Sequence, residues 1–212
     1  QKALVVNCHH TKNHNSTAYE LFFNSGPLAI LPMKKFKKNL YSSSVIWTHN
    51  QDYINSLCAS KKNLLSLILE EKINIYIGEI NEIVNVQCFN LTAHLNKTFY
   101  ENRVLYLGDA AHSIHPIAGQ GWNVGVRDIK NCLEIIQQNM NLGLDIGSLN
   151  VCKQYHHKRF YDSYFLFQIT DKLNTIFLND NLFINTLRKQ GFKLINNKKN
   201  IKNFITNFAM GY

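Results

Sequence analysis

The sequence predicts an α/β fold, and three observations carry this prediction. Short β-branched and aromatic runs fill the first half, separated by Gly, Pro and a lysine cluster, as is typical of an antiparallel sheet. The continuously apolar residues 104–107 are followed by a glycine-containing loop and then by a helical pattern. From about Leu149 onward the apolar spacing stays helical. We therefore expect a sheet, then a strand–loop–helix unit, then C-terminal helices.

The first half consists of strand-like segments joined by turns. The strand-like segments are KALVVNCHH, YELFFN, LAILPM and SSSVIWTH. The lysines between Pro32 and Leu40 predict an exposed hairpin tip. SKKNLLSLILEEK has the composition of a helix, and INIYIGEINEIVNVQCF returns to the alternation of a strand. These segments predict an antiparallel sheet with one helix.

The second half opens with residues 104–107, which we expect to form a strand buried on both faces. Apolar residues then recur at steps of four and three, which predicts one helical stripe. This stripe comprises Trp122, Val126, Ile129, Leu133, Ile136 and Met140. We expect it, Trp122 included, to face the core. A second stripe near the C-terminus comprises Ile201, Phe204, Ile205 and Phe208.

Composition excludes several classes of protein. Hydrophobic residues make up 45% of the chain, as in globular proteins, and no apolar run approaches the ~18 residues of a membrane span. The formal net charge of +9 suits an anionic lipid or ligand, but no basic helix with interleaved aromatics suggests nucleic acid. Five scattered cysteines without a CxxC pair favour reduced thiols in a cytoplasmic setting and no metal site.

The stretch LGDAAHSIHPIAGQGWNVGVRDI, residues 107–129, contains the candidate site. A helix N-terminus carries unpaired N–H groups, and Gly119 and Gly121 let a ligand reach them. Asp109, at the end of a strand, suits the hydroxyl groups of a sugar-like chain. A flavin, with its ribityl chain and its carbonyl-bearing ring, satisfies both ends. The alternative is an ordinary strand–turn–helix in which Asp109 is a helix cap.

The same stretch resembles the second flavin-binding motif of the class A flavoprotein aromatic monooxygenases. Within that class it is most similar to the ubiquinone-biosynthesis (polyprenyl-methoxyphenol) hydroxylases. The residues that match the motif are Gly108, Asp109, Ala110, Ala111, His112, Pro116, Gly119, Gln120, Gly121, Asn123, Gly125 and Asp128. Residues 17–33 and 155–181 resemble the substrate-domain strands and the C-terminal helices of that family. The resemblance covers nearly the whole chain and implies the C-terminal part of a PHBH-like FAD/NAD(P)-binding fold.

The resemblance also implies a division of the chain. Residues 1–97 are expected to form part of a substrate-binding sheet domain, residues 98–145 the second half of the FAD-binding domain, and residues 146–212 a C-terminal helical region. Members of the family begin with a Rossmann unit whose GxGxxG motif binds the ADP part of FAD. This chain has no GxGxxG, and its opening QKALVVN reads as a strand already under way. We therefore expect the Rossmann unit to lie outside this chain.

By the same resemblance, Asp109 holds the ribityl hydroxyls and Pro116 lies against the flavin. The remaining cofactor contacts are expected at Gly108, Gly119, Gln120, Gly121, Trp122 and Asn123, although for Trp122 the core position competes with stacking on the flavin. His112 and Asp128 are expected to order the loop and the helix, and no catalytic residue is singled out. The implied cofactor is FAD, with NAD(P)H as a transient co-substrate.

The implied reaction is FAD-dependent hydroxylation of a polyprenyl phenol in ubiquinone biosynthesis, with O2 as the oxidant. Two alternatives stay open: a non-catalytic remnant, and one subunit of a split flavoenzyme that needs a separate N-terminal Rossmann half. Because the substrate is insoluble and lysines flank the C-terminal stripe, we expect a cytoplasmic protein attached peripherally to the inner face of the membrane, or a member of a biosynthetic complex.

Overall fold

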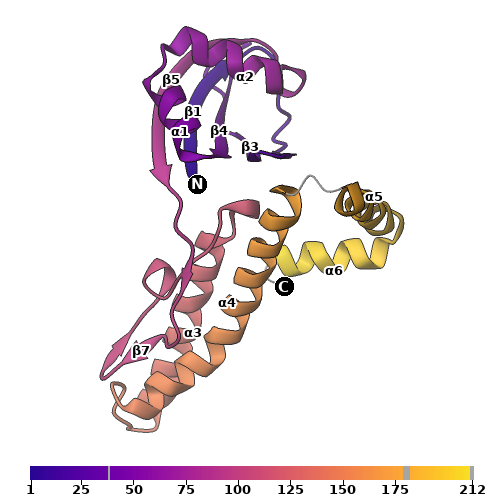
Figure 1. Cartoon of the computed structure of the whole chain (residues 1–212). Helices are drawn as coiled ribbons and strands as arrows, with labels where there is room; N and C mark the ends of the chain where they lie inside the picture. Colours follow the sequence, from indigo (N-terminus) through magenta and orange to yellow (C-terminus); the bar gives the residue numbers. More distant parts are fainter. Residues whose placement is uncertain (38, 179–181, 211–212) are drawn as a thin grey trace. The chain divides into compact units, whose positions relative to one another are not determined.

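The computed structural model describes residues 1–37, 39–178 and 182–210. The chain forms two units, Gln1–Leu91 and Thr92–Tyr212. The first unit contains a five-stranded sheet and two helices, and the second is mainly helical (Figure 1). The predicted α/β fold is therefore confirmed, with the sheet and the C-terminal helices in the expected parts of the chain.

The sheet of the first unit is antiparallel throughout, with the strand order β2-β3-β4-β1-β5. Its strands are β1 (Lys2–His10), β2 (Tyr19–Phe23), β3 (Gly26–Pro32), β4 (Tyr41–His49) and β5 (Ile80–Asn90). β3 and β4 form a hairpin whose tip exposes Lys34, Lys35 and Lys37, as predicted. The pairing of β1 with β5 shifts its register twice, between Asn7 and Cys8 and between His9 and His10.

Two helices, α1 (Gln51–Ala59) and α2 (Lys62–Ile77), pack on one face of this sheet. The side chains buried between them and the sheet include Leu4, Val6, Leu28, Ile30, Trp47, Ile54, Leu57, Leu65, Leu69 and Ile73. The expectation of one helix was wrong, because α1 was missed. Its signal is Asn50, whose side chain accepts a hydrogen bond from the Tyr53 amide at 2.9 Å and so caps the helix.

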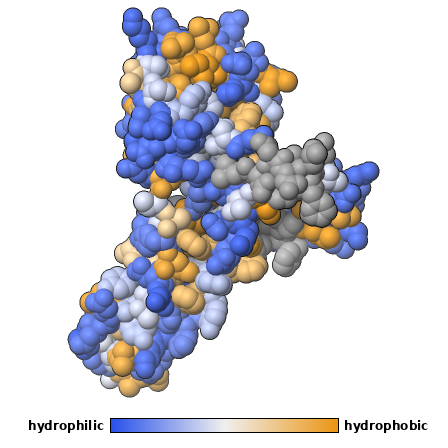
Figure 2. Space-filling model, in the orientation of Figure 1, coloured by the Kyte–Doolittle hydropathy of each residue, from blue (hydrophilic) through white to orange (hydrophobic). Residues whose placement is uncertain are grey.

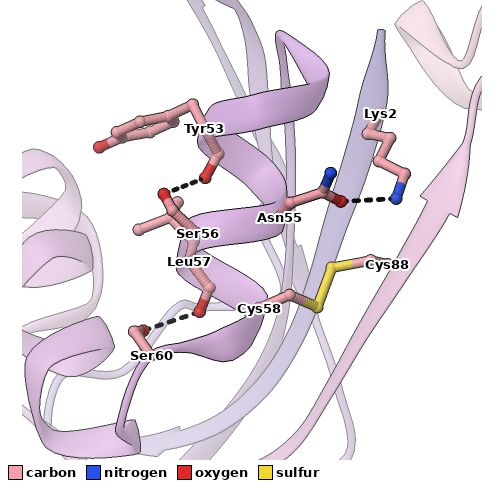
Figure 3. The surroundings of a disulfide bond; sticks show 8 residues. All are labelled: Lys2, Tyr53, Asn55, Ser56, Leu57, Cys58, Ser60 and Cys88. Atoms are coloured by element: carbon pink, nitrogen blue, oxygen red, sulfur yellow. Dashed lines mark hydrogen bonds between the residues drawn. A yellow bond between two sulfur atoms is a disulfide. The ribbon is translucent and has the colours of Figure 1, made fainter.

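Cys58 and Cys88 form a disulfide, which corrects the expectation of reduced thiols throughout the chain. Figure 3 shows that the bond joins the C-terminal end of α1 to β5. The two residues are thirty positions apart, with Cα atoms 6.7 Å apart. The sequence did not predict this pairing, because no short motif contains both cysteines. The two thiols come together only when α1 packs beside β5. Cys8, Cys132 and Cys152 are free, and burial raises the pKa of Cys8 to about 12.

The second unit is built around α3 (Gly121–Asn141) and α4 (Leu149–Leu178), which lie side by side (Figure 1). Short segments precede them, namely β6 (His94–Leu95), β7 (Tyr100–Glu101), β8 (Val104–Leu105), η1 (Gly108–Ala110), β9 (His112–Ser113) and η2 (Ile117–Gly119). A small core of Phe99, Ala111, Ile135, Val151 and Tyr155 joins these segments to the two helices.

Two expectations about burial in this unit were wrong. Residues 104–107 form no strand covered on both faces: β8 has two residues, Val104 is 45% exposed, and within the described chain β8 pairs with β7 alone. The stripe on α3 does not face the core either, and Trp122 is 81% exposed. The period of the stripe was predicted correctly, but periodicity alone does not say which face of a helix is covered.

The chain continues into α5 (Leu182–Asn197) and α6 (Lys199–Met210). Of the expected C-terminal stripe, Ile201 is 41% exposed, whereas the side chains of Phe204, Ile205 and Phe208 lie outside the described residues. None of the helices, as far as they are described, has the length and apolar character needed to cross a bilayer.

Candidate functional site

A pocket of about 610 Å³ opens between the loop after β8 and the first turns of α3. Such a volume is within the range of small-molecule sites. Its lining consists of Leu107, Gly108, Asp109, Ser113, Ile114, Pro116, Gly119, Gly121, Trp122, Gly125, Val126 and Ile129. Six of the eight site residues expected from the sequence are thus brought together. Gln120 and Asn123 are absent from the lining; the Asn123 amide instead donates to the Gln120 side-chain oxygen at 3.3 Å.

Two glycines shape the loop of this pocket. Gly108 has φ 55° and Gly119 has φ 60°, a backbone conformation that L side chains adopt at a cost. A Cβ placed on Gly119 or on Gly121 would meet no atom within 4 Å, so both glycines border open space. A bound molecule can therefore approach the backbone closely at this end of the pocket.

Gly108 also lies against α3. A Cβ built on Gly125 would come within 3.7 Å of the Gly108 Cα atom, so the loop and the helix meet backbone to backbone. This close approach brings the end of β8 beside the first turns of α3. The positive φ of Gly108 accounts for the glycine at that position, whereas a Cβ on Gly125 would make an ordinary van der Waals contact.

Asp109 and the start of α3 offer complementary polar groups. Asp109 lies in η1 with an exposed side chain, and within the described part of the chain its carboxylate has no hydrogen-bonding partner. The N-cap residue of α3 is Gln120, and no side chain caps the helix. The alternative in which Asp109 is a helix cap is therefore wrong. The pocket has a carboxylate at one end and uncapped helix N–H groups, which attract anionic and carbonyl oxygens, at the other.

Asp128 anchors the pocket from inside α3. Its fully buried carboxylate accepts three hydrogen bonds: from the Gly108 amide at 2.9 Å, from His112 Nε2 at 2.7 Å and from Arg159 Nε at 2.7 Å. Arg159, from α4, also donates to Asp162 at 2.7 Å. These contacts tie the loop, β9, α3 and α4 together. His112 and Asp128 thus order the loop and the helix, as the sequence predicted.

The protonation states follow from these contacts. Burial alone would raise the pKa of Asp128, but the hydrogen bonds from His112, Arg159 and the Gly108 amide outweigh it, so the pKa lies below its usual value. Burial also lowers the pKa of Arg159, but its bonds to Asp128 and Asp162 reverse that effect and the pKa rises. Asp128 and Arg159 are therefore both ionised at neutral pH.

Some residues of the site were not expected from the sequence. Ser113, Ile114, Val126 and Ile129 also line the pocket, and Arg159 holds its anchor. The position of Arg159 could have been inferred from the sequence, because Arg159 follows Tyr155 by four residues and residues four apart share one face of a helix. No sequence pattern indicated Ser113 and Ile114, since their place in the pocket lining depends on the path of an irregular loop.

The family model described as FAD binding domain (FAD_binding_3) matches residues 3–159. The chain belongs to this family. The chain is 31% identical over 211 residues to ubiquinone hydroxylase UbiL of Rhodospirillum rubrum, covering 100% of this chain and 48% of that protein. It is 28% identical to the ubiquinone biosynthesis monooxygenase COQ6 of Dictyostelium discoideum, covering 92% and 44% of the two chains.

Solved structures agree on the fold. The p-nitrophenol 4-monooxygenase PnpA of Pseudomonas putida has a TM-score of 0.73 and 15% identity, with 99% of this chain and 53% of that chain covered. The aromatic hydroxylase CabE from angucycline biosynthesis has a TM-score of 0.63 and 17% identity, with 100% and 41% covered. The chain thus has the PHBH-like fold of FAD-dependent monooxygenases, over the part of that fold that it spans. It spans about half the length of the curated relatives that it matches.

Proposed function

We propose that the pocket beside α3 holds the ribityl chain and the ring of FAD. The observation that carries this proposal is that Asp109, whose carboxylate has no partner among the described residues, shares one pocket with a helix start that no side chain caps. The ribityl hydroxyls can donate to Asp109, and the carbonyl oxygens of the ring can accept from the N–H groups at residues 121–123. The open space at Gly119 and Gly121 gives the ring access to that backbone.

The residue roles follow from position. Gly108, Pro116 and Trp122 line the pocket and contact the flavin from its sides. Gln120 and Asn123, joined through their side chains, support the turn into α3, whose first N–H groups we propose as donors to the ring. Helix N–H groups are suited to the pyrimidine edge, because negative charge gathers there when a flavin is reduced. FAD supplies the redox and oxygen chemistry when it is bound, and the protein supplies orientation.

The activity we propose is hydroxylation of a polyprenyl phenol in ubiquinone biosynthesis, with NAD(P)H as reductant and O2 as oxidant. Support comes from relatives named as ubiquinone hydroxylases or ubiquinone biosynthesis monooxygenases over most of this chain's length. We place the protein in the cytoplasm, attached peripherally to the membrane surface where an insoluble substrate resides. Since the chain spans about half of those relatives, we propose this activity for the whole protein rather than for residues 1–212 alone.

The site is tested by titrating FAD into the chain and into the Asp109→Asn variant, following flavin fluorescence. Loss of a charged hydrogen-bond acceptor should weaken binding by about tenfold or more, because bonds to charged groups are worth about 1.5–3 kcal/mol. The unfolding midpoint should not change, since the Asp109 carboxylate bonds to none of the residues that the structure describes. Unchanged affinity in the variant would refute the assignment of Asp109.

A second candidate is favoured by one specific observation. The exposed apolar stripe on α3 suits a subunit of a split flavoenzyme, completed by a separate Rossmann half. A non-catalytic remnant remains the third possibility, and it predicts no FAD binding at all. Measuring FAD affinity with and without a supplied Rossmann half separates the three candidates. A remnant binds no FAD in either case, and a split subunit binds FAD more tightly when the Rossmann half is present. A chain that holds FAD by itself binds it equally in both cases.

A further inference from the structure

The tip of the β3–β4 hairpin concentrates positive charge. Residues 21–51 contain four lysines and no Asp or Glu, and all four lysines fall within residues 34–38. Lys34, Lys35 and Lys37 are exposed, and none of the three forms an ion pair with any residue that the structure describes. Their charge is therefore not neutralised by carboxylates of the described chain.

Apolar side chains are exposed among these lysines. Met33 is 43% exposed and Phe36 is 49% exposed. The Nζ atom of Lys37 lies 4.9 Å from the centre of the Phe36 ring, so charged and apolar groups interleave. Figure 2 shows apolar residues at the surface of the first unit among hydrophilic ones. We call Met33, Lys34, Lys35, Phe36 and Lys37 the basic tip.

Contacts with the sheet hold the basic tip in place. Lys37 and Leu40 exchange two backbone hydrogen bonds, at 3.3 and 3.2 Å, which close the turn. The Phe36 ring stacks on His9 of β1, with the ring centres 3.9 Å apart. His9 is itself fixed, because its Nδ1 atom lies 2.9 Å from the Ser42 hydroxyl oxygen on β4. The folded sheet therefore keeps Phe36 at the surface, with one face of its ring covered.

We propose that the basic tip is a docking surface for an anionic lipid bilayer. The proposal rests on the peripheral attachment proposed above and assigns to it a surface in the first unit. The lysine ammonium groups lie at the lipid phosphates, while Met33 and Phe36 enter the boundary between headgroups and acyl chains. Each lysine near an anionic surface strengthens binding by about fivefold. The charge of the tip and its exposed apolar groups thus act together on one partner.

The size and chemistry of the basic tip favour a bilayer over a macromolecular partner. A stable protein interface draws on about 20–30 residues from each partner, far more than this turn supplies. Single-stranded nucleic acid is bound by stacking of bases on free aromatic faces. Phe36 is poorly suited to stacking, because His9 covers one face of its ring and Lys37 Nζ lies over the ring. Insertion into a bilayer surface needs only a few apolar side chains beside positive charge.

The test measures co-sedimentation of the full chain with vesicles of phosphatidylcholine, with and without phosphatidylglycerol. The charge variant carries Lys34→Gln, Lys35→Gln and Lys37→Gln. The matched control loses the same charge at three exposed lysines elsewhere, through Lys61→Gln, Lys97→Gln and Lys153→Gln. We expect the unaltered chain and the control to bind the vesicles that contain phosphatidylglycerol, and the charge variant to bind them at least about tenfold more weakly. Far-UV circular dichroism establishes that both variants keep their fold.

Fluorescence quenching tests insertion of the tip directly. Phe36→Trp places a fluorophore in the basic tip, and Leu67→Trp, at a side chain that is 65% exposed on α2, is the matched control. The emission of the unaltered chain is subtracted from both. Phosphatidylglycerol vesicles with brominated acyl chains should quench the added emission of Phe36→Trp and leave that of Leu67→Trp unchanged. Equal quenching of the two variants, or of neither, would overturn the proposal.

The outcomes separate this proposal from the proposed function. Equal vesicle binding by the charge variant and its control would overturn the role of the basic tip and leave peripheral attachment standing. Failure of the unaltered chain to bind anionic vesicles would overturn both. Capture of the chain by soluble polyglutamate, without binding to vesicles, would overturn the proposal by assigning the tip to an acidic polypeptide. The flavin site is tested independently, because it is measured by FAD affinity without lipid.

Discussion

Replacing Asp128 by Ala should destabilise the second unit more than any other single change in the pocket. The substitution removes the acceptor for the Gly108 amide, for His112 and for Arg159, all within 2.9 Å. Arg159 is 4% exposed and would keep only its bond to Asp162. Breaking a buried ion pair from one side costs about 3–5 kcal/mol. With a slope of about 2 kcal/mol per molar urea, the unfolding midpoint should fall by about 1.5–2.5 M.

Urea unfolding followed by far-UV circular dichroism measures this change. The matched control is Glu134→Gln, because Glu134 pairs with Lys158 at 2.8 Å between the same two helices but at the surface. Exposed ion pairs contribute little, so the control should unfold with the unaltered chain. A midpoint for Asp128→Ala within error of that control would refute the account of Asp128 as the anchor of the pocket.

Acid should act on the same group. The pKa of Asp128 is lower in the folded protein than in the unfolded chain, so the carboxylate stabilises the fold fully above its ordinary pKa. This contribution should be lost as the pH falls below about 4 toward the depressed folded value. Asp128→Asn lacks the titrating group and should flatten the stability profile in that acid range. An unchanged acid limb in the variant would assign the loss to other carboxylates.

Three further predictions concern other parts of the chain. Gly119→Ala should lower the free energy of unfolding by about 1–2 kcal/mol because of its φ of 60°, whereas Gly121→Ala, with no positive φ, should leave the urea midpoint unchanged. Reducing the Cys58–Cys88 bond should destabilise the first unit by about 3–4 kcal/mol for a loop of thirty residues, measured by Trp47 fluorescence in urea; alkylation of all five cysteines in denaturant without reductant would contradict it. Deleting residues 198–212 should reduce co-sedimentation with anionic liposomes, and salt should weaken the binding of the intact chain; equal binding by the truncated chain would exclude this segment as the anchor.

Much of the fold follows from local patterns. The four strands before Asn50, a helix over residues 60–72 and the start of a helix at Gly121 were all predictable, because β-branched runs, helix formers and glycine turns act over a few residues. The expectation of a strand from residue 73 was wrong, because α2 continues to Ile77 and β5 begins at Ile80. The small helix α1 was missed although Asn50 gives a cap signal, because its composition is weakly helical. Local propensity therefore located the elements better than it located their ends.

What the sequence could not give was the environment of each face. The apolar stripe expected on α3 has the period of a core helix, yet five of its six residues are exposed. Burial depends on which elements lie nearby rather than on the period itself. The Cys58–Cys88 bond and the Asp128–Arg159 pair join residues about thirty positions apart and arise only after helices pack. For the site, the glycines and Asp109 were found by motif, whereas Ser113 and Ile114 depend on the path of the loop.

The two register shifts between β1 and β5 affect how the sheet meets other molecules. β5 is an edge strand of eleven residues, and the carbonyl groups of Ile83 and Val84 on it accept hydrogen bonds from the Lys62 side chain. A long edge strand can in general pair with a strand of another molecule. The irregular pairing of β5 with β1 increases the local twist of the strand. It also disturbs the regular spacing of backbone groups that a strand of a second sheet would need for pairing. The irregular register of β5 therefore protects the folded sheet against edge-to-edge aggregation. A regular β5 of the same length would be an exposed template for fibril growth.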